Sequence, residues 1–261
     1  MYKEVDNVGK NVTYHVNKKH GYGIITLNRP EKRNAISKIM INKLANYVEK
    51  AKQDPIKCLI ITGSGERMFS AGGDLHYFHG DLSADEAFSR LYSMKEVLYD
   101  IVSFPVPTIA LLNGDALGGG CELATACDIR IAKEGTQFGF VQSSLGIIPG
   151  WGGGVLLYEK VDSSFAFQWL LEATVYEAAH LQKRGWIHNI VSKDQWVHMD
   201  LVLQPYIEKS LDQLKVLKSQ YKSKLSVLSF SAMMSEEVRQ CAQLWNSPRH
   251  QEKVQQFLTK K

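Results

Sequence analysis

An α/β fold followed by a helical C-terminal region is the fold class that this sequence predicts. Three observations lead to it: apolar strand-like runs alternate with helical patterns, glycine-rich turns follow two of these runs, and no strand pattern remains from about Gln195 onward. We therefore expect a core over residues 1–195 and a helical region over residues 196–261. The apolar stripes of the helical region must be buried against another surface, for which a partner subunit is one candidate.

The chain opens with the pattern of a β-hairpin across residues 12–29. Val12, Tyr14 and Val16 alternate with other residues, a Lys-Lys-His-Gly turn follows, and residues 24–27 resume the apolar run. A helix is expected next, because Ser37 is a favourable N-cap and apolar residues recur at helical spacing until Asp54-Pro55. These apolar residues are Ile41, Leu44, Ala45, Val48 and Ala51.

Strands and helices then alternate along the chain. Buried strands are predicted over residues 58–62, 108–112 and 129–132. Helices are predicted from the capping box of Ser83 and Glu86 to a point before Pro105, and from about Gly118 to Cys127. A stretch broken by glycines follows at residues 135–154, and helical patterns occupy the rest of the chain.

The composition limits the class of protein. A chain of 261 residues with 44% hydrophobic residues can bury a large core, which excludes a disordered protein. Its longest apolar runs are far shorter than the roughly 20 residues that span a bilayer, so we expect a soluble protein without a membrane partner. Four cysteines without metal-ligand spacing predict buried reduced thiols and a cytoplasmic location. They are Cys58, Cys121, Cys127 and Cys241.

The charge of the chain argues against a nucleic-acid partner. The formal net charge is +4, and the basic residues are scattered rather than gathered in one stripe. A mild basic bias suits a small anionic ligand. The densest basic cluster is interpreted as a solvated helix face rather than a binding site. It comprises Lys209, Lys215, Lys218, Lys222 and Lys224.

Two glycine-rich turns carry the first functional signal. Each turn, at residues 69–75 and 113–122, follows a strand-like run and directs bare backbone N–H groups outward. A strand that feeds a glycine run at a helix start forms an anion site, because unpaired N–H groups and the positive end of the helix dipole face one point. Neither turn matches G-x-G-x-x-G or a P-loop, and the chain has no G-x-S-x-G motif. Taken alone, the glycines could equally serve tight turns or close packing.

Five blocks in order resemble the enoyl-CoA hydratase/isomerase (crotonase) superfamily. They are Ile24 to Pro30, Arg33-Asn34-Ala35, Phe69 to Leu75, Ala116 to Asp128, and Leu145-Gly146-Ile147-Ile148-Pro149. The resemblance implies a spiral of repeated ββα units, a trimer or a dimer of trimers, and an acyl-CoA thioester substrate that brings its own coenzyme A. No metal and no separate cofactor are expected.

The resemblance also assigns site residues. Gly73 and Gly119 are expected to hold the thioester oxygen through two backbone N–H groups as it becomes an enolate. Residues that match the family's CoA contacts are Lys32, Arg33, Ala35, Ala71, Gly73, Asp74, Leu75, Phe257 and Lys260. Asp74 could instead cap a short helix, and exposed basic residues such as Lys32 and Arg33 often bind nothing specific.

Two further positions decide the expected chemistry. Glu122 lies one helical turn after Gly119, and the resemblance makes it one of the two glutamates that hydratases use. The alternative is a carboxylate that only complements the helix dipole. Gln142 stands where the second glutamate is expected, and an amide can orient water but cannot carry a proton.

Decarboxylation of a short-chain 2-carboxyacyl-CoA therefore leads the functional hypotheses, because loss of carbon dioxide delivers the enolate without a base. The blocks Ala116 to Asp128, Phe140-Val141, residues 146–153 and Leu244 to Pro248 resemble the ethylmalonyl-CoA decarboxylase branch. An ionised Glu122 about 4 Å from a substrate carboxylate would repel it by ~4 kcal/mol at an effective dielectric constant of 20. Glu122 must then be turned away, or protonated and able to donate its proton to the enolate.

Two alternatives stay open. One is a 2-enoyl-CoA hydratase in which Glu122 and Gln142 hold water. The other is a catalytically silent acyl-CoA binding protein. His76 and His79 could line the acyl pocket or face solvent, and Trp151 could be a packing residue or a pocket wall. Gly154-Val155-Leu156 replaces the family's usual Thr-Gln-Arg, which leaves the start of the following helix in question.

Overall fold

The structure, a computed structural model, describes residues 11–78, 82–225, 227–245 and 247–259. Its first layer is a six-stranded sheet in the order β1-β2-β3-β5-β7-β10. Only β1 and β2 pair antiparallel; the other neighbours are parallel. The strands are β1 (Val12–Asn17), β2 (Tyr22–Leu27), β3 (Cys58–Gly63), β5 (Thr108–Leu112), β7 (Ile129–Lys133) and β10 (Asn189–Val191).

A second, smaller sheet has the order β4-β6-β8-β9. Its strands are β4 (Met68–Ser70), β6 (Asp115–Leu117), β8 (Gln137–Gly139) and β9 (Tyr176–Glu177). In three successive ββα units the first strand joins the large sheet and the second joins the small sheet. The units are β3-β4-α3, β5-β6-α4 and β7-β8-α5, where α3 is Ala84–Val102, α4 is Gly119–Ala126 and α5 is Gly153–Lys160.

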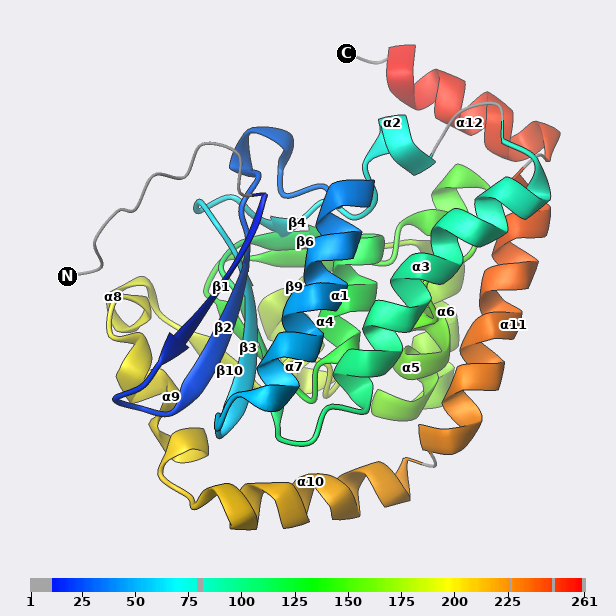
Figure 1. Cartoon of the computed structure of the whole chain (residues 1–261). Coiled ribbons are helices and arrows are strands. Elements are labelled where there is room, and N and C mark those ends of the chain that lie inside the picture. Colours follow the sequence, from blue (N-terminus) through cyan, green and yellow to red (C-terminus); the bar gives the residue numbers. More distant parts are fainter. Residues whose placement is uncertain (1–10, 79–81, 226, 246, 260–261) are drawn as a thin grey trace.

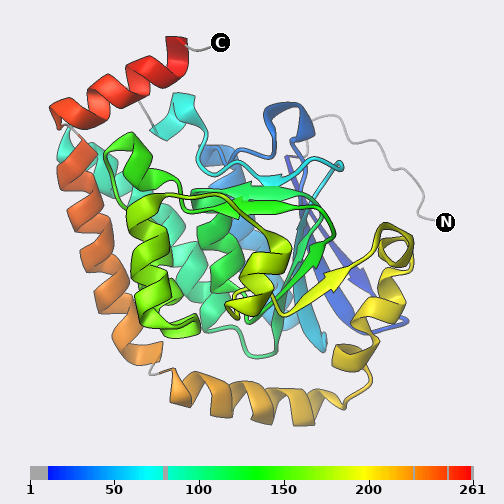
Figure 2. The same cartoon turned by 180° about the vertical axis from the view of Figure 1, so that it is seen from behind.

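The remaining helices surround these sheets (Figure 1). Helix α3 runs between α1 and α11, while α10 passes along one end of the molecule and α12 crosses near α2 (Figures 1 and 2). Their bounds are α1 (Lys38–Gln53), α2 (Leu75–Phe78), α6 (Ser163–Glu172), α7 (Ala178–Lys183), α8 (Lys193–Trp196), α9 (Met199–Ile207), α10 (Leu211–Lys224), α11 (Val227–Trp245) and α12 (Pro248–Thr259), with 3-10 helices η1 (Pro30–Lys32) and η2 (Gln142–Leu145).

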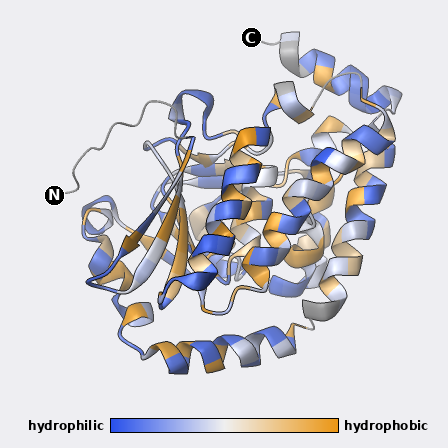
Figure 3. Cartoon of the chain, viewed as in Figure 1, coloured by the Kyte–Doolittle hydropathy of each residue, from blue (hydrophilic) through white to orange (hydrophobic). Residues whose placement is uncertain are grey.

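Apolar residues fill the space between the large sheet and helices α1, α3, α4, α5 and α11. Figure 3 shows hydrophobic colour along the strands and hydrophilic colour on much of the outer surface of α1, α3 and α12. The opposite face of the large sheet packs on α9 through a second apolar cluster that includes Ile60, Ile109 and Leu203. No helix in the described ranges is long and apolar enough to cross a bilayer.

The predicted α/β fold, the hairpin and the helix bounds are confirmed. Ser83 and Glu86 form the predicted capping box. Ser37 occupies the N-cap of α1, but its side chain makes no capping hydrogen bond. The short strands of the second sheet were not predicted, nor was β10, which lies in a stretch assigned to helical patterns, because two or three residues are too few to show a period. The division at residue 195 remains a prediction.

Two expectations about the helical region need correction. The apolar stripe of α11 is buried within this chain, since Phe230, Met234 and Val238 belong to the main core. Lys218, assigned to a solvated face, is buried and forms an ion pair with Asp128. Sequence spacing placed Lys218 on α10 correctly but could not show that a buried carboxylate faces it.

Candidate active site

The two glycine-rich turns meet in the structure. Strands β4 and β6 pair in parallel, so the turns that follow them leave the same edge of the small sheet. Gly72 has φ of +90°, and a Cβ at this residue would lie 2.9 Å from Gly119 N. A Cβ at Gly120 would lie 2.3 Å from Ser70 O. Glycine is required at both positions, because any side chain would separate the two backbones.

This contact places the Gly73 and Gly119 backbones side by side. Gly119 is the first residue of α4, whose opening N–H groups have no partner within the helix. Among the residues that the structure describes, neither the Gly73 N–H nor the Gly119 N–H donates a hydrogen bond. Two unpaired donors, one of them at the positive end of a helix dipole, suit an oxygen that gains negative charge.

Two aromatic rings cover the same glycines. A Cβ at Gly73 would lie 2.6 Å from the Phe78 ring, and a Cβ at Gly119 would lie 2.3 Å from the Trp151 ring. The centroids of the two rings are 5.7 Å apart, and both side chains are buried. Trp245 of α11 donates through Nε1 to Phe78 O at 3.0 Å. Trp151 is therefore a wall of the site, and the end of α11 helps to place the other wall.

Glu122 is buried on the first turn of α4, and all of its carboxylate positions are engaged. Its Oε1 accepts from Gln142 Nε2 at 2.9 Å and from Gly150 N at 3.3 Å. Its Oε2 accepts from Trp151 N at 2.8 Å and from Gly153 N at 3.0 Å. Burial raises the pKa of Glu122, although these four donors act in the opposite direction. The carboxylate is thus turned toward the loop that carries Trp151.

Gln142 lies at the start of η2, beside Gly118 and Glu122. Its amide nitrogen is held by Glu122, whereas its Oε1 is buried without a hydrogen-bond partner among the described residues. A buried unpaired acceptor is rare because it loses its bonds to water. The amide oxygen is therefore a candidate contact for a substrate group or a bound water.

Sequence reasoning missed Glu237, a buried carboxyl on α11. Its Oε2 accepts from Val155 N at 2.7 Å and its Oε1 from Gly154 N at 3.4 Å. This contact explains the departure from the family's sequence at Gly154-Val155-Leu156, because a Cβ at Gly154 would lie 2.6 Å from Glu237 Oε2. Helix α5 begins at Gly153 with two carboxyl groups at its first N–H groups. Helical spacing could have found it, because Glu237 lies three residues after Met234 and four before Cys241 on the apolar stripe of α11, whereas the exposed Glu236 does not.

The turn expected to contact CoA adjoins these residues. Ala71 N donates to Arg33 O at 3.0 Å, which ties this turn to the first glycine turn. Arg33 and Asn34 have φ of 54° and 53°, and the Asn34 amide bonds Arg29 N, Ser64 O and Met68 O. Lys32 and Arg33 are exposed, and Ala35 and Leu75 are half-buried.

Asp74 lies just before α2 and makes contacts through both its side chain and its carbonyl group. Its carboxylate forms an ion pair with Arg29, and its carbonyl accepts from the N–H groups of Tyr77 and Phe78. Lys260 and His79 lie outside the described residues, as do the side chains of Phe257 and His76. The backbone of α12 is described, and His250 Nδ1 lies 2.7 Å from Leu145 O, so this helix flanks η2.

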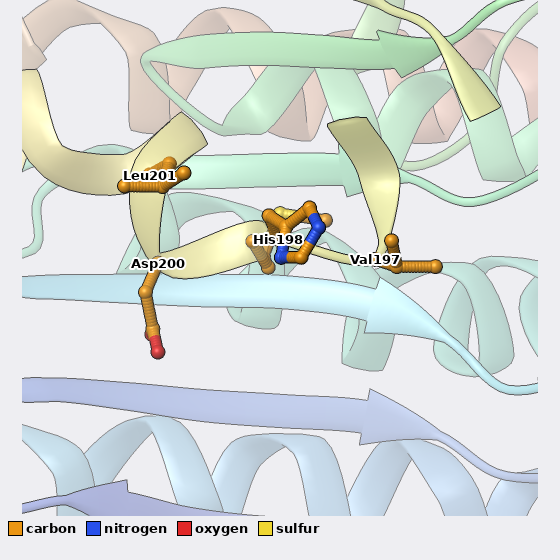
Figure 4. Close-up of a pocket in the computed structure, with 5 residues that line it drawn as sticks. Val197, His198, Asp200 and Leu201 are labelled. Carbon is orange, nitrogen blue, oxygen red and sulfur yellow. The ribbon is translucent and has the colours of Figure 1, made fainter. Parts of the chain in front are cut away.

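Two cavities lie elsewhere in the molecule. One, of about 330 Å³, is lined by residues 197–201. Figure 4 shows their side chains pointing in different directions. Asp200 there accepts from Tyr22 Oη at 3.1 Å, and its Oδ2 lies 3.6 Å from His20 Nε2. A second, of about 320 Å³, lies on the outer face of the large sheet between Ile60 and Met199. The second cavity is lined in part by Asn113, at the start of the second glycine turn, but neither cavity is lined by Gly73, Gly119 or Glu122. We therefore locate the site by its unpaired donors.

Comparison with known proteins identifies the family. The profile of the enoyl-CoA hydratase/isomerase family matches residues 17–261. The chain belongs to this family, whose members act on acyl-CoA. A crystal structure of an enoyl-CoA hydratase from Mycobacterium avium subsp. paratuberculosis superposes with a TM-score of 0.84, covering 96% of each chain at 23% identity. That likeness confirms the crotonase-like fold.

Curated relatives carry hydratase names. A crotonyl-CoA hydratase of Syntrophomonas wolfei is 37% identical over 179 residues, which are 68% of this chain and 68% of the relative. The human mitochondrial methylglutaconyl-CoA hydratase is 35% identical over 176 residues, 67% of this chain but only 52% of its own length. The 2,3-dehydroadipyl-CoA hydratase of Escherichia coli is 35% identical over 66% of each.

Proposed function

We propose that this protein is an acyl-CoA lyase that decarboxylates a short-chain 2-carboxyacyl-CoA of the methylmalonyl-CoA or ethylmalonyl-CoA type. One observation carries the proposal: the Glu122–Gln142 pair offers no free base. Gln142 has no titratable proton. All four acceptor positions of the Glu122 carboxylate face N–H donors. Hydration and double-bond migration both need a positioned base, whereas decarboxylation does not.

The reaction requires little from the protein beyond an oxyanion site. The bond between the α-carbon and the carboxylate breaks, carbon dioxide leaves, and the electron pair moves through the α-carbon onto the thioester oxygen. We assign the Gly73 and Gly119 N–H groups to that oxygen, and each such donor contributes roughly 2.7–4 kcal/mol of transition-state stabilisation in enzymes where it has been removed. The α-carbon then takes a proton. We assign that proton to water, because Glu122 directs its oxygens at the 150–153 turn.

The orientation of Glu122 also answers the electrostatic objection. A carboxylate whose oxygens meet three backbone N–H groups has its charge partly compensated. It is turned toward the Trp151 loop, as a site for an anionic substrate requires. Glu122→Gln with an unchanged decarboxylation rate would exclude the proton-donor role suggested by the sequence.

For the CoA half of the substrate we propose the turn at residues 32–35, joined by Ala71, Asp74 and Leu75. The exposed side chains of Lys32 and Arg33 support this assignment, since they can meet phosphates without being desolvated. Phe257 and Lys260 would complete the CoA site from the C-terminal helix, and no cofactor beyond the substrate's own coenzyme A is proposed.

We also propose a homotrimer or a dimer of trimers in the cytoplasm. Phe167 and Leu171 on α6 and the nearby Val175 are large apolar side chains exposed by 58%, 66% and 43%. Their clustering supports an interface. Four free buried cysteines support a reducing compartment. Light scattering of the purified protein would check the mass.

The second candidate is a 2-enoyl-CoA hydratase, favoured by the names of the relatives and by the unpaired Gln142 Oε1, which could hold a water. The third is a silent acyl-CoA binding protein. Incubation of the protein with ethylmalonyl-CoA, methylmalonyl-CoA and, separately, crotonyl-CoA distinguishes them by product mass. We expect loss of carbon dioxide from the first two substrates and little change in crotonyl-CoA. Rapid hydration of crotonyl-CoA would favour the second candidate, and binding without turnover the third.

A further inference from the structure

Two buried carboxyl groups from different helices meet the start of α5. Glu122 of α4 accepts from the N–H groups of Trp151 and Gly153, and Glu237 of α11 accepts from those of Gly154 and Val155. Gly153 and Gly154 are consecutive, so the two acids bind adjacent positions of one turn. A Cβ at Gly153 would lie 2.4 Å from Glu122 Cβ, and one at Gly154 would lie 2.6 Å from Glu237 Oε2. Only glycines admit both acids at this helix end.

The pair has no cationic partner. In the described part of the chain, neither Glu122 nor Glu237 forms an ion pair with Lys, Arg or His. The other titratable side chains that interact with it are Tyr158 of α5 and the thiols of Cys121 and Cys241. Burial raises the pKa of each of these three groups, so they are neutral near pH 7. The helix dipole is the one positive field that both carboxyls share.

Two ionised carboxylates buried at one helix end repel each other strongly, and a proton bound by the pair removes that repulsion. Glu122 accepts four N–H bonds, whereas Glu237 accepts two, one of them at 3.4 Å, and has a smaller interaction with the Gly152 N–H. Bonds from N–H groups favour the ionised form, so the proton belongs on the carboxyl with fewer of them.

We propose that Glu237 is a positioning residue of the candidate active site. It carries the one proton that is bound by the Glu122–Glu237 pair, and it fixes the 150–155 turn that carries Trp151. The protonated Glu237 lets Glu122 remain ionised and keep its four donors in place. Trp151 is thereby held over Gly119, one of the two donors assigned to the enolate oxygen. Burial and the charge of Glu122 raise the pKa of Glu237 well above its usual range, in agreement with this arrangement.

The test follows the carboxyl groups directly. Protein labelled with ¹³C at the glutamate carboxyl carbon is titrated, and infrared or NMR signals of protonated carboxyl are recorded from pH 5 to 9. We expect one protonated glutamate at pH 7 in the wild type, and its signal to be missing in Glu237→Gln. The matched control is Glu236→Gln, the same change at the neighbouring exposed residue, which should retain the signal.

A second variant keeps the test valid if Glu237→Gln does not fold. In Glu122→Gln the repulsion is gone, so Glu237 should lose its proton at a pH lower by more than about one unit. Absence of protonated carboxyl at pH 7 in the wild type, persistence of the signal in Glu237→Gln, or an unshifted titration in Glu122→Gln would overturn the inference.

The link between this pair and Trp151 rests on the proposed function, but the titration uses no substrate. A wild type that fails to decarboxylate any thioester and still shows the shared proton would refute the function and leave the pair intact. A wild type that decarboxylates a thioester but shows no protonated glutamate at pH 7 would refute the shared proton and leave the proposed function intact. The pH profile of turnover gives the corresponding functional measurement, since Glu237→Gln should remove the decline expected as the pair loses its proton.

Discussion

Replacing Gln142 by glutamate is the most direct test of the proposal that the Glu122–Gln142 pair offers no free base. Gln142 Nε2 lies 2.9 Å from Glu122 Oε1, so the variant puts a carboxyl against a carboxyl. If both were ionised at that 2.9 Å distance, their repulsion would be roughly 6 kcal/mol at an effective dielectric constant of 20. This equals about four pKa units, so one of the two carboxyls should stay protonated at neutral pH. The variant would then have one protonated and one ionised carboxyl, the acid and the base that the wild type lacks.

We expect Gln142→Glu to hydrate crotonyl-CoA ~10²–10⁴ times faster than the wild type, the usual contribution of a positioned acid or base. Decarboxylation should change little, because the bound proton leaves the two carboxyls with one negative charge, the same as the ionised Glu122 of the wild type. The assay follows the loss of the enoyl thioester absorbance and the mass of the products. Gln142→Met is the control, since it removes the amide without adding an acid and should gain no hydration. A folded Gln142→Glu with no gain, or a wild type that already hydrates as fast, would refute the reasoning.

Three further predictions concern the site and its support. Asp128→Asn should destabilise the fold by about 3–5 kcal/mol in urea unfolding, because it leaves Lys218 buried without its counter-charge; an unchanged midpoint would contradict the buried pair. Gly119→Ala should lower turnover by at least ~10², since its Cβ would lie 2.3 Å from the Trp151 ring and displace a proposed oxyanion donor; wild-type kinetics would remove Gly119 from the site. Because the pKa of Glu237 is raised, the folded state still binds a proton that the unfolded state has released above pH 4.5. The free energy of unfolding should therefore decline as pH rises, by up to about 1.4 kcal/mol per pH unit, until the folded-state pKa is passed. Unfolding curves at several pH values check this slope, which Glu237→Gln should abolish.

The C-terminal helices illustrate how the site depends on parts of the chain that carry no motif. Trp245 of α11 holds the carbonyl of Phe78, Glu237 of the same helix holds the start of α5, and His250 of α12 contacts Leu145. Trp245 falls in the block Leu244 to Pro248 that resembles the decarboxylase branch, but none of these three residues was assigned a role from the sequence. A buried position on a helix is readable from spacing, but the group that a side chain meets across the core is not.

The sequence by itself determined the order of the longer strands and helices, the two glycine turns, and the substitution of an amide at Gln142, because these features depend on local spacing and residue chemistry. Tertiary structure decided which groups meet: Gly72 against Gly119, Trp151 and Phe78 over the two donors, and Glu122 and Glu237 at one helix end. Tertiary structure also decided the orientation of Glu122 toward the 150–153 turn. It follows from backbone N–H groups that point at one spot only after α4 and α5 have packed together, and no pattern along the chain encodes that convergence.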